Sequence, residues 1–158
     1  MDVRLTVCAA AGLSVCALLL SGCGPASGGV LGLRREVDGT LSAVVEMCTG
    51  GVDGVIAYVP DTDIDLSWEF AERVTEEGSL PLGVQFEDDL DAEETYLAYG
   101  WSSDSAVKAD GVDFTQAQLA GLAVGDIWSF GWLDDAAAHA YSTDDFHAMV
   151  ERYCAQLP

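Results

Sequence analysis

Alternation of apolar and polar residues dominates the middle of the chain. Between residues 64 and 71, Ile, Leu, Trp and Phe alternate with Asp, Ser, Glu and Ala. Successive side chains of a strand point to opposite faces, so this period of two predicts a strand with one buried face. A helix over "SWEFAERVTEEG" is the competing interpretation, because Ser67 could cap it, Glu69 and Arg73 stand four apart, and Gly78 could end it.

Other short apolar segments are also typical of strands, and most of them are bounded by turn residues such as Asp38-Gly39, Asp53-Gly54 and Asp110-Gly111. The remaining predicted strands are residues 31–37, 41–48, 55–59, 82–87, 96–101 and 127–132. Roughly seven short strands at this spacing predict a mainly β fold, an immunoglobulin-like antiparallel β-sandwich.

The period changes near the C-terminus. Apolar residues there follow the helical spacing i, i+3, i+4 and i+7, at Phe146, Met149, Val150 and Tyr153. Ser142 or Thr143 can cap this helix, and the two aspartates that follow are favoured in its first turn. We therefore expect one amphipathic helix over residues 143–155, packed on the sandwich.

The N-terminus has the layout of a secretory signal. A short start with Asp2 and Arg4 precedes an uncharged apolar segment, Leu5 to Leu20, and small residues follow. This apolar segment is shorter than the ~20 residues of a spanning helix, and the string "GPASGG" after it breaks helices. The layout predicts export.

The residues at the end of this segment are Leu20, Ser21, Gly22 and Cys23, and together they resemble the lipobox of bacterial lipoproteins. The resemblance implies that the Cys23 thiol receives a diacylglyceryl group and that a peptidase cuts before it. Two acyl chains would give stable membrane attachment without a spanning helix. The alternatives for Cys23 are a buried or disulfide-bonded cysteine, or an uncleaved helix anchor.

This reading divides the chain into a signal peptide at 1–22, a lipidated cysteine with a short linker at 23–29, and one domain at 30–158. Cys8 and Cys16 leave with the signal, so the domain keeps Cys48 and Cys154. An even pair in an oxidising compartment predicts one disulfide. Two separate buried thiols are the alternative.

Charge excludes several partners. The chain carries 27 acids and 6 bases, a net charge of −21, and loss of Asp2 with Arg4 leaves that value unchanged. Such a surface repels phosphate backbones and anionic headgroups, so we expect no nucleic-acid binding and no basic membrane patch. The charge suits either cations and basic partners or simple solubility. The Ala-, Gly- and Asp-rich, Lys-poor composition is typical of a GC-rich actinobacterium.

The segment "LAGLAVGDIW", residues 119–128, resembles the corner of fibronectin type III and related immunoglobulin-like domains. In that family a Leu-x-x-Leu turn and a Gly lead into a strand that opens with an aromatic, usually Tyr, whose hydroxyl pins the corner. Here Trp128 stands in that position, and Ala123-Val124 replaces the common proline. A short amphipathic helix followed by any strand is the alternative.

Acidic residues suggest a calcium site. Asp61, Asp63, Asp65 and Glu72 fall on positions 1, 3, 5 and 12 of an EF-hand loop, but Leu66 stands where the loop requires Gly. An irregular calcium site on Asp61, Asp63 and Asp65 stays open, with calcium as the possible cofactor of the chain. The second acidic run, residues 87–94, is more typical of a solvated loop.

Motifs for catalysis are sparse. His139 and His147 lie near several acids but have no HExxH spacing. The string "SAVK" from Ser105 to Lys108 matches a Ser-x-x-Lys start without its partner motifs, and the chain has no Gly-x-Ser-x-Gly elbow or phosphate-binding Gly loop. These observations exclude the common enzyme classes that such motifs define.

Aromatic residues offer a contact surface instead. Trp128, Phe130 and Trp132 alternate in "WSFGW", so a strand would present them on one face, where they would bind carbohydrate or protein if exposed. Core packing is the alternative. We expect a non-enzymatic lipoprotein on the extracytoplasmic side of the cell membrane, binding an envelope protein or glycan. A small envelope hydrolase or metal-dependent enzyme, and a calcium-stabilised module, are the other hypotheses.

Overall fold

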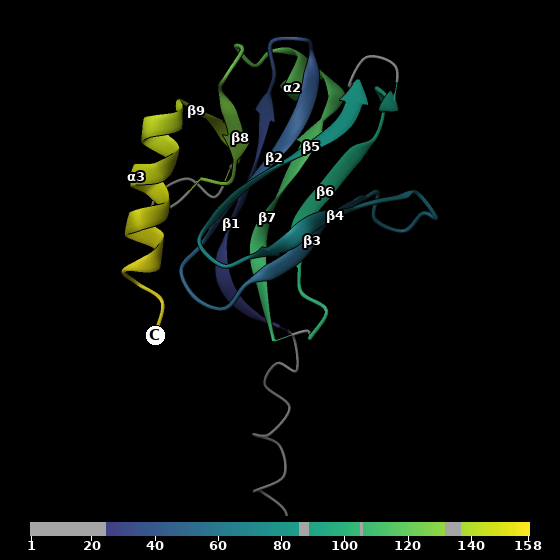
Figure 1. The fold of residues 1–158 in the computed structure, drawn as a ribbon. Helices are drawn as coiled ribbons and strands as arrows, with labels where there is room; N and C mark the ends of the chain where they lie inside the picture. The colour runs from purple at the N-terminus through teal and green to yellow at the C-terminus, as the bar shows by residue number, and fades with distance from the viewer. Residues whose placement is uncertain (1–24, 86–88, 105, 132–136) are drawn as a thin grey trace, which may run out of the picture.

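The computed structural model describes residues 25–158 except 86–88, 105 and 132–136, and its described elements are mainly strands (Figure 1). The elements in chain order are β1 Ala26–Arg35, β2 Thr40–Met47, β3 Val52–Tyr58, β4 Asp65–Val74, β5 Glu77–Gln85, β6 Thr95–Trp101, β7 Val107–Thr115, α2 Gln116–Ala120, β8 Ile127–Ser129, β9 His139–Tyr141 and α3 Thr143–Cys154. The predicted mainly β fold with one C-terminal helix is confirmed. Residues 65–70 belong to a strand rather than to the competing helix, with Leu66, Trp68 and Phe70 half-buried between exposed neighbours. Ile64, predicted on the same buried face, precedes the strand and is exposed.

One sheet contains all nine described strands. Seven form the path β4-β3-β6-β7-β1-β2-β5, and β8 and β9 extend from β1. All pairings are antiparallel except β1 with β7, so the sheet is mixed rather than purely antiparallel. The alternation of residues along a strand specifies its buried face but not its neighbours, which is why the parallel pair is visible only in the structure.

The sheet curls so that its two halves face each other across one core, as in a sandwich (Figure 1). All seven strands of the path contribute buried side chains to this core. The two end strands, β4 and β5, meet through side chains, and the Trp68 indole N–H donates to the Leu82 carbonyl at 2.9 Å. Pro81 on β5 and several acids on β4 make these edges poor templates for another strand.

Helix α3 covers the outer face of β1 and β2 (Figure 1). The four predicted apolar residues of the helix are buried, in a second cluster with Val30, Val44 and Ile127. Gly32 lies under this helix, where a Cβ would stand 2.3 Å from the Ile127 side chain and 3.1 Å from the Phe146 ring. Ser142 caps the helix by accepting from the Asp145 N–H, as the sequence predicts.

The predicted Cys48–Cys154 disulfide is present, with 5.2 Å between the two Cα atoms. It joins the end of β2 to the last residue of α3, across a separation of 106 residues. The bond therefore staples the C-terminal helix to the sheet.

The sheet begins earlier than the expected domain boundary at residue 30, because β1 starts at Ala26. The glycines of the expected linker are close-approach positions. A Cβ on Gly28 would stand 2.7 Å from the Thr49 carbonyl oxygen, and one on Gly29 would stand 2.4 Å from that of Glu46. The two glycines give this segment the composition of a flexible linker, but they are present because close packing leaves no room for a side chain at either position.

Strands β7 and β9 are absent from the predicted set. Asp110-Gly111, read as a turn from the sequence, lies inside β7. A Cβ on Gly111 would stand 1.8 Å from the Ala98 carbonyl oxygen, and the register with β6 shifts between Ala98 and Gly100. Gly111 therefore serves an irregular strand pairing rather than a reversal of the chain.

The corner at residues 119–128 combines both readings of its sequence. The short helix α2 ends at Ala120, and Gly125, with φ of +89°, leads into β8. Leu119 and Leu122 are buried, and the Trp128 indole N–H donates to the Asp113 carbonyl at 3.0 Å. Trp128 thus pins the corner with its indole nitrogen.

Candidate contact surface

Large apolar side chains lie on the outer side of β3 and β6, next to the region that α3 covers. They are Ile56, Tyr58, Leu97, Tyr99 and Trp101, and we call them the open face. Each is half-buried, and none belongs to either core cluster or to the residues packed against one. No element of the described structure therefore covers the apolar sheet surface that these five side chains form.

The strand register places these side chains in rows across the sheet, because directly paired residues point to the same side. Tyr58 pairs with Leu97, Ile56 with Tyr99, and Gly54 with Trp101. A Cβ on Gly54 would stand 2.7 Å from the Trp101 indole nitrogen, so the glycine makes room for the indole ring.

Acidic residues border the open face on two sides. On β4, Asp65 pairs with Tyr58 and Glu69 pairs with Gly54; on β7, Asp113 pairs with Leu97. All three acids are exposed. The open face is thus an apolar strip two strands wide between two acidic margins.

A hollow of about 580 Å³ adjoins the strip, between Tyr58 and Tyr99 on one side and Phe130 on the other. The Tyr58 and Tyr99 rings meet edge to face, with centroids 6.1 Å apart. Lys108 and Asp110 also line the hollow, and they form an ion pair at 3.2 Å.

Asp110 is the centre of a polar network at this hollow. Its carboxylate accepts from the Ser27 hydroxyl at 2.7 Å and from the Tyr153 hydroxyl at 2.6 Å. Burial and the hydrogen bond to Asp110 raise the pKa of Tyr153 to about 12. The network joins β1, β7 and α3, and its partners leave Lys108 neutralised beside the strip.

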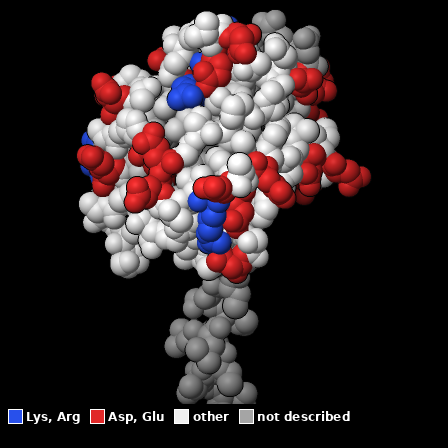
Figure 2. Space-filling view, in the orientation of Figure 1, with Lys and Arg blue, Asp and Glu red and all other residues white. Residues whose placement is uncertain are grey.

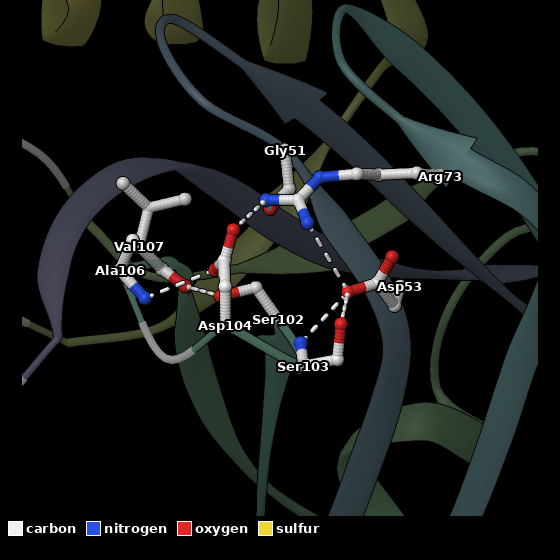
Figure 3. Close-up of polar contacts among 8 residues, drawn as sticks. All are labelled: Gly51, Asp53, Arg73, Ser102, Ser103, Asp104, Ala106 and Val107. Atoms are coloured by element: carbon white, nitrogen blue, oxygen red, sulfur yellow. Dashed lines mark hydrogen bonds and ion pairs between the residues drawn. The ribbon is translucent and has the colours of Figure 1, made fainter.

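A second polar network fixes the end of β6 that carries Trp101 (Figure 3). The Arg73 guanidinium contacts the Asp53 carboxylate at 3.4 Å and the Asp104 carboxylate at 3.0 Å, and it donates to the Gly51 carbonyl. Asp53 also accepts from the backbone N–H and hydroxyl of Ser103, at 2.7 and 2.8 Å. The network ties β3, β4 and the β6–β7 turn together.

These hydrogen bonds act on the charged form of the acids. Those from Ser103 are the main cause that lowers the pKa of Asp53, and Arg73 adds to it. The backbone N–H of Ala106 is the main cause that lowers the pKa of Asp104. The network therefore stabilises the ionised form of both carboxylates.

The aromatic residues that were expected to form a contact surface on one strand face do not lie together on the open face. Trp128 packs against the main core and Phe130 against the cluster under α3, and both are half-buried. Strand β8 ends at Ser129, so Phe130 follows it rather than extending it. Trp132 lies outside the described residues. Of this set, Phe130 borders the hollow beside the open face.

The calcium hypothesis gains no geometric support. Asp61, Asp63 and Asp65 are exposed at the turn between β3 and β4 and the start of β4. Within the part of the chain that the structure describes, no three His, Cys, Asp or Glu side chains converge as a metal site would require.

The two histidines occupy different structural settings. The exposed His139 ring lies against Tyr141, with centroids 4.1 Å apart. The His147 Nδ1 lies 2.5 Å from Oε1 of Glu46, which joins α3 to β2. Burial raises the pKa of Glu46, although His147 nearby opposes that effect. Neither histidine joins a metal cluster among the described residues.

The open face had a signal in the sequence. The strand "TYLAYGW" is apolar at almost every position, so both of its faces carry apolar side chains. Such a strand is expected to be covered on both sides. Only the structure shows that α3 covers β1 and β2 instead.

Cys23 lies outside the described residues, and the first described residue is Pro25. Among the described helices, none has the length and apolar character to cross a membrane. Comparison of the chain with models of protein families, with curated proteins and with solved structures finds no match in any of the three. The function is therefore inferred from the sequence and structure of the chain itself.

Proposed function

We propose that the chain is a membrane-anchored extracytoplasmic lipoprotein whose domain is a non-catalytic binding module, with the open face as its contact surface. The observation that carries the binding role is the position of Tyr58, Leu97 and Tyr99 outside both core clusters. Exposed apolar surface costs solubility, so a contiguous patch of it marks an interaction site. Tyr and Trp are also the residue types enriched where proteins bind partners.

The anchor rests on the lipobox resemblance at Cys23, and the disulfide supports export. Cys48 and Cys154 are bonded, and structural disulfides persist in oxidising compartments. Strand β1 starts three residues after Cys23, and those residues span about 10 Å at most. An acyl anchor at Cys23 would hold the domain against the headgroup region.

The arrangement of the reactive groups supports a binding role rather than a catalytic one. The histidines are dispersed, and Lys108, Asp110 and Tyr153 are engaged with one another and with Ser27 at fixed positions. The surface that stands out is apolar and shallow rather than a cleft with converging acids and bases.

The anchor is tested by the intact mass of the membrane-extracted protein before and after reduction and thiol labelling. We expect residues 23–158 plus acyl groups, with labels at two sites only after reduction. Cys23→Ala is the control and should lose the acyl mass. A full-length, unlipidated mass would overturn the anchored lipoprotein.

The binding role is tested by placing a photoreactive amino acid at position 97 of the full chain in the producing cells. The matched control places it at position 148, an exposed residue of α3. We expect adducts of defined mass from position 97 and none of that mass from position 148. Equal adduct yields, or none from position 97, would remove the open face as a binding surface.

A further inference from the structure

We propose that the partner of the open face is a cationic amphipathic segment of another protein, with apolar residues along its centre and Lys or Arg at both margins. This inference rests on the proposed binding role and specifies its ligand.

The width of the strip argues for this occupant. Asp65 on β4 and Asp113 on β7 belong to one row, three strand spacings apart, which is about 14 Å. A helix with its side chains is about 10–12 Å wide. One helix laid along β3 and β6 would cover the apolar centre and bring its marginal side chains to both rims.

The length of the strip fits the same partner. Three rows, from Tyr58 and Leu97 to Gly54 and Trp101, span four residue steps of an extended strand. Four steps measure about 14 Å, which corresponds to two to three turns of a helix. A segment of that length presents an apolar stripe at the spacing i, i+3, i+4 and i+7.

The acidic rims of the strip determine which charge the margins of the partner should carry. The rim acids Asp65, Glu69 and Asp113 are exposed, and none of their carboxylates makes a hydrogen bond or ion pair with another residue that the structure describes. The neighbouring cations are occupied: Lys108 pairs with Asp110, and Arg73 pairs with Asp53 and Asp104. Both rims therefore attract cations, and Lys or Arg over Tyr58, Tyr99 or Trp101 would add cation–π attraction.

The same charge excludes competing occupants. A second copy of the chain also carries −21, so two open faces would repel each other across their rims. A neutral glycan could stack on the rings but would gain nothing from the fixed negative rims. Figure 2 shows that acidic side chains are spread over the visible surface, with the few basic side chains beside acidic ones.

The test uses the purified full chain in nonionic detergent and a synthetic amphipathic peptide of leucine and lysine. Binding is measured by calorimetry, with the titration into protein-free micelles subtracted. The peptide with glutamate in place of lysine, and a neutral oligosaccharide, are titrated in parallel. We expect the cationic peptide alone to bind, with an affinity that falls as salt rises.

A charge-reversed variant, Asp65→Lys with Asp113→Lys, locates the site. The matched control is Glu76→Lys with Glu151→Lys, which makes the same change in net charge at exposed positions outside the strip. We expect the rim variant to lose about tenfold or more in affinity and the control less than about twofold. Thermal unfolding of both variants checks that the fold is retained.

Equal losses in the two variants, no binding by the unaltered chain, or binding of the oligosaccharide instead would overturn the cationic partner. Each of these results is separable from failure of the binding role. Adducts at position 97 without peptide binding would leave the open face a binding surface for a different ligand.

Discussion

The Tyr153 hydroxyl in the last turn of α3 donates to the Asp110 carboxylate on β7 at 2.6 Å. The next residue, Cys154, is bonded to Cys48 at the end of β2. The C-terminal helix is therefore fixed to two different strands by consecutive residues, one through a hydrogen bond and the other through a covalent bond. This anchorage holds α3 on β1 and β2, so none of the described elements covers the outer side of β3 and β6.

The hydrogen bond is tested by Tyr153→Phe. Asp110 keeps Ser27 and Lys108, so we expect a loss of about 1–2 kcal/mol in the free energy of unfolding at neutral pH. Chemical denaturation measures this loss. Tyr58→Phe is the control, because the Tyr58 hydroxyl makes no such bond to any residue that the structure describes, and it should change stability by less than about 0.5 kcal/mol.

Alkaline pH gives a second signature of Tyr153. Its pKa in the folded state, about 12, lies above its ordinary value near 10, so the stability it contributes is complete below about pH 10. That contribution is lost as the pH rises through about 12. Unfolding experiments at pH 9 to 12 should show a steeper loss for the unaltered chain than for Tyr153→Phe. Parallel curves would contradict the assignment.

The disulfide is tested by Cys48→Ser with Cys154→Ser. The bond closes a loop of 106 residues, so its loss should cost about 5 kcal/mol in the loop-entropy model. We expect the unaltered chain under reducing conditions to match the variant in denaturant unfolding. A midpoint unmoved by reduction would show that packing of α3 alone holds the helix in place.

Asp53→Ala tests the network beside Trp101. The substitution removes the acceptor for the two Ser103 hydrogen bonds, so we expect a loss of about 1 kcal/mol at neutral pH. The pKa of Asp53 is lowered in the folded state, so its contribution is present above its ordinary value and is lost as the pH falls through the lowered one. The difference between variant and unaltered chain should therefore shrink in acid. Asp63→Ala, at an exposed turn, is the control and should change the free energy of unfolding by less than about 0.5 kcal/mol at neutral pH.

Glu46→Gln should act in the opposite direction. Burial raises the pKa of Glu46 in the folded state, while His147 favours its charge and Glu77 and Glu151 oppose it. The contribution of this carboxyl is most favourable below its ordinary pKa and is lost as the pH rises through the raised one. We expect the amide to stabilise the fold at pH 7 by about 1 kcal/mol or less, and the gain to vanish near pH 4. Destabilisation at pH 7 would show that the His147 contact outweighs burial.

Local pattern was enough to predict much of the fold. The strand at residues 65–74 and the helix at 143–154 carry periods of 2 and 3.6, which report directly on one buried side. Strand β7 escaped prediction because Asp110-Gly111 has turn composition, although Gly111 is required by close contact with Ala98. Glycine is found both in turns and at close-packed strand positions, so residue type alone does not distinguish the two.

The candidate site was predicted less well. The contact surface was expected on Trp128, Phe130 and Trp132, whereas Trp128 and Phe130 pack against separate clusters and Trp132 lies outside the described residues. Leu97, Tyr99 and Trp101 alternate just as regularly. Sequence spacing identifies a shared strand face, but not whether another element covers that face.

By itself the sequence determined the hydrophobic periods of the strands and of the C-terminal helix, and the negative charge. It also identified the two cysteines that can form a disulfide. These features depend on residue type and local spacing. The tertiary structure alone decided the order of the strands, the parallel pairing of β1 with β7, and the side of the sheet that α3 covers. These features depend on contacts between residues far apart in the chain. The same contacts place Tyr58, Tyr99 and Trp101 between acidic margins, on a face that no described element covers.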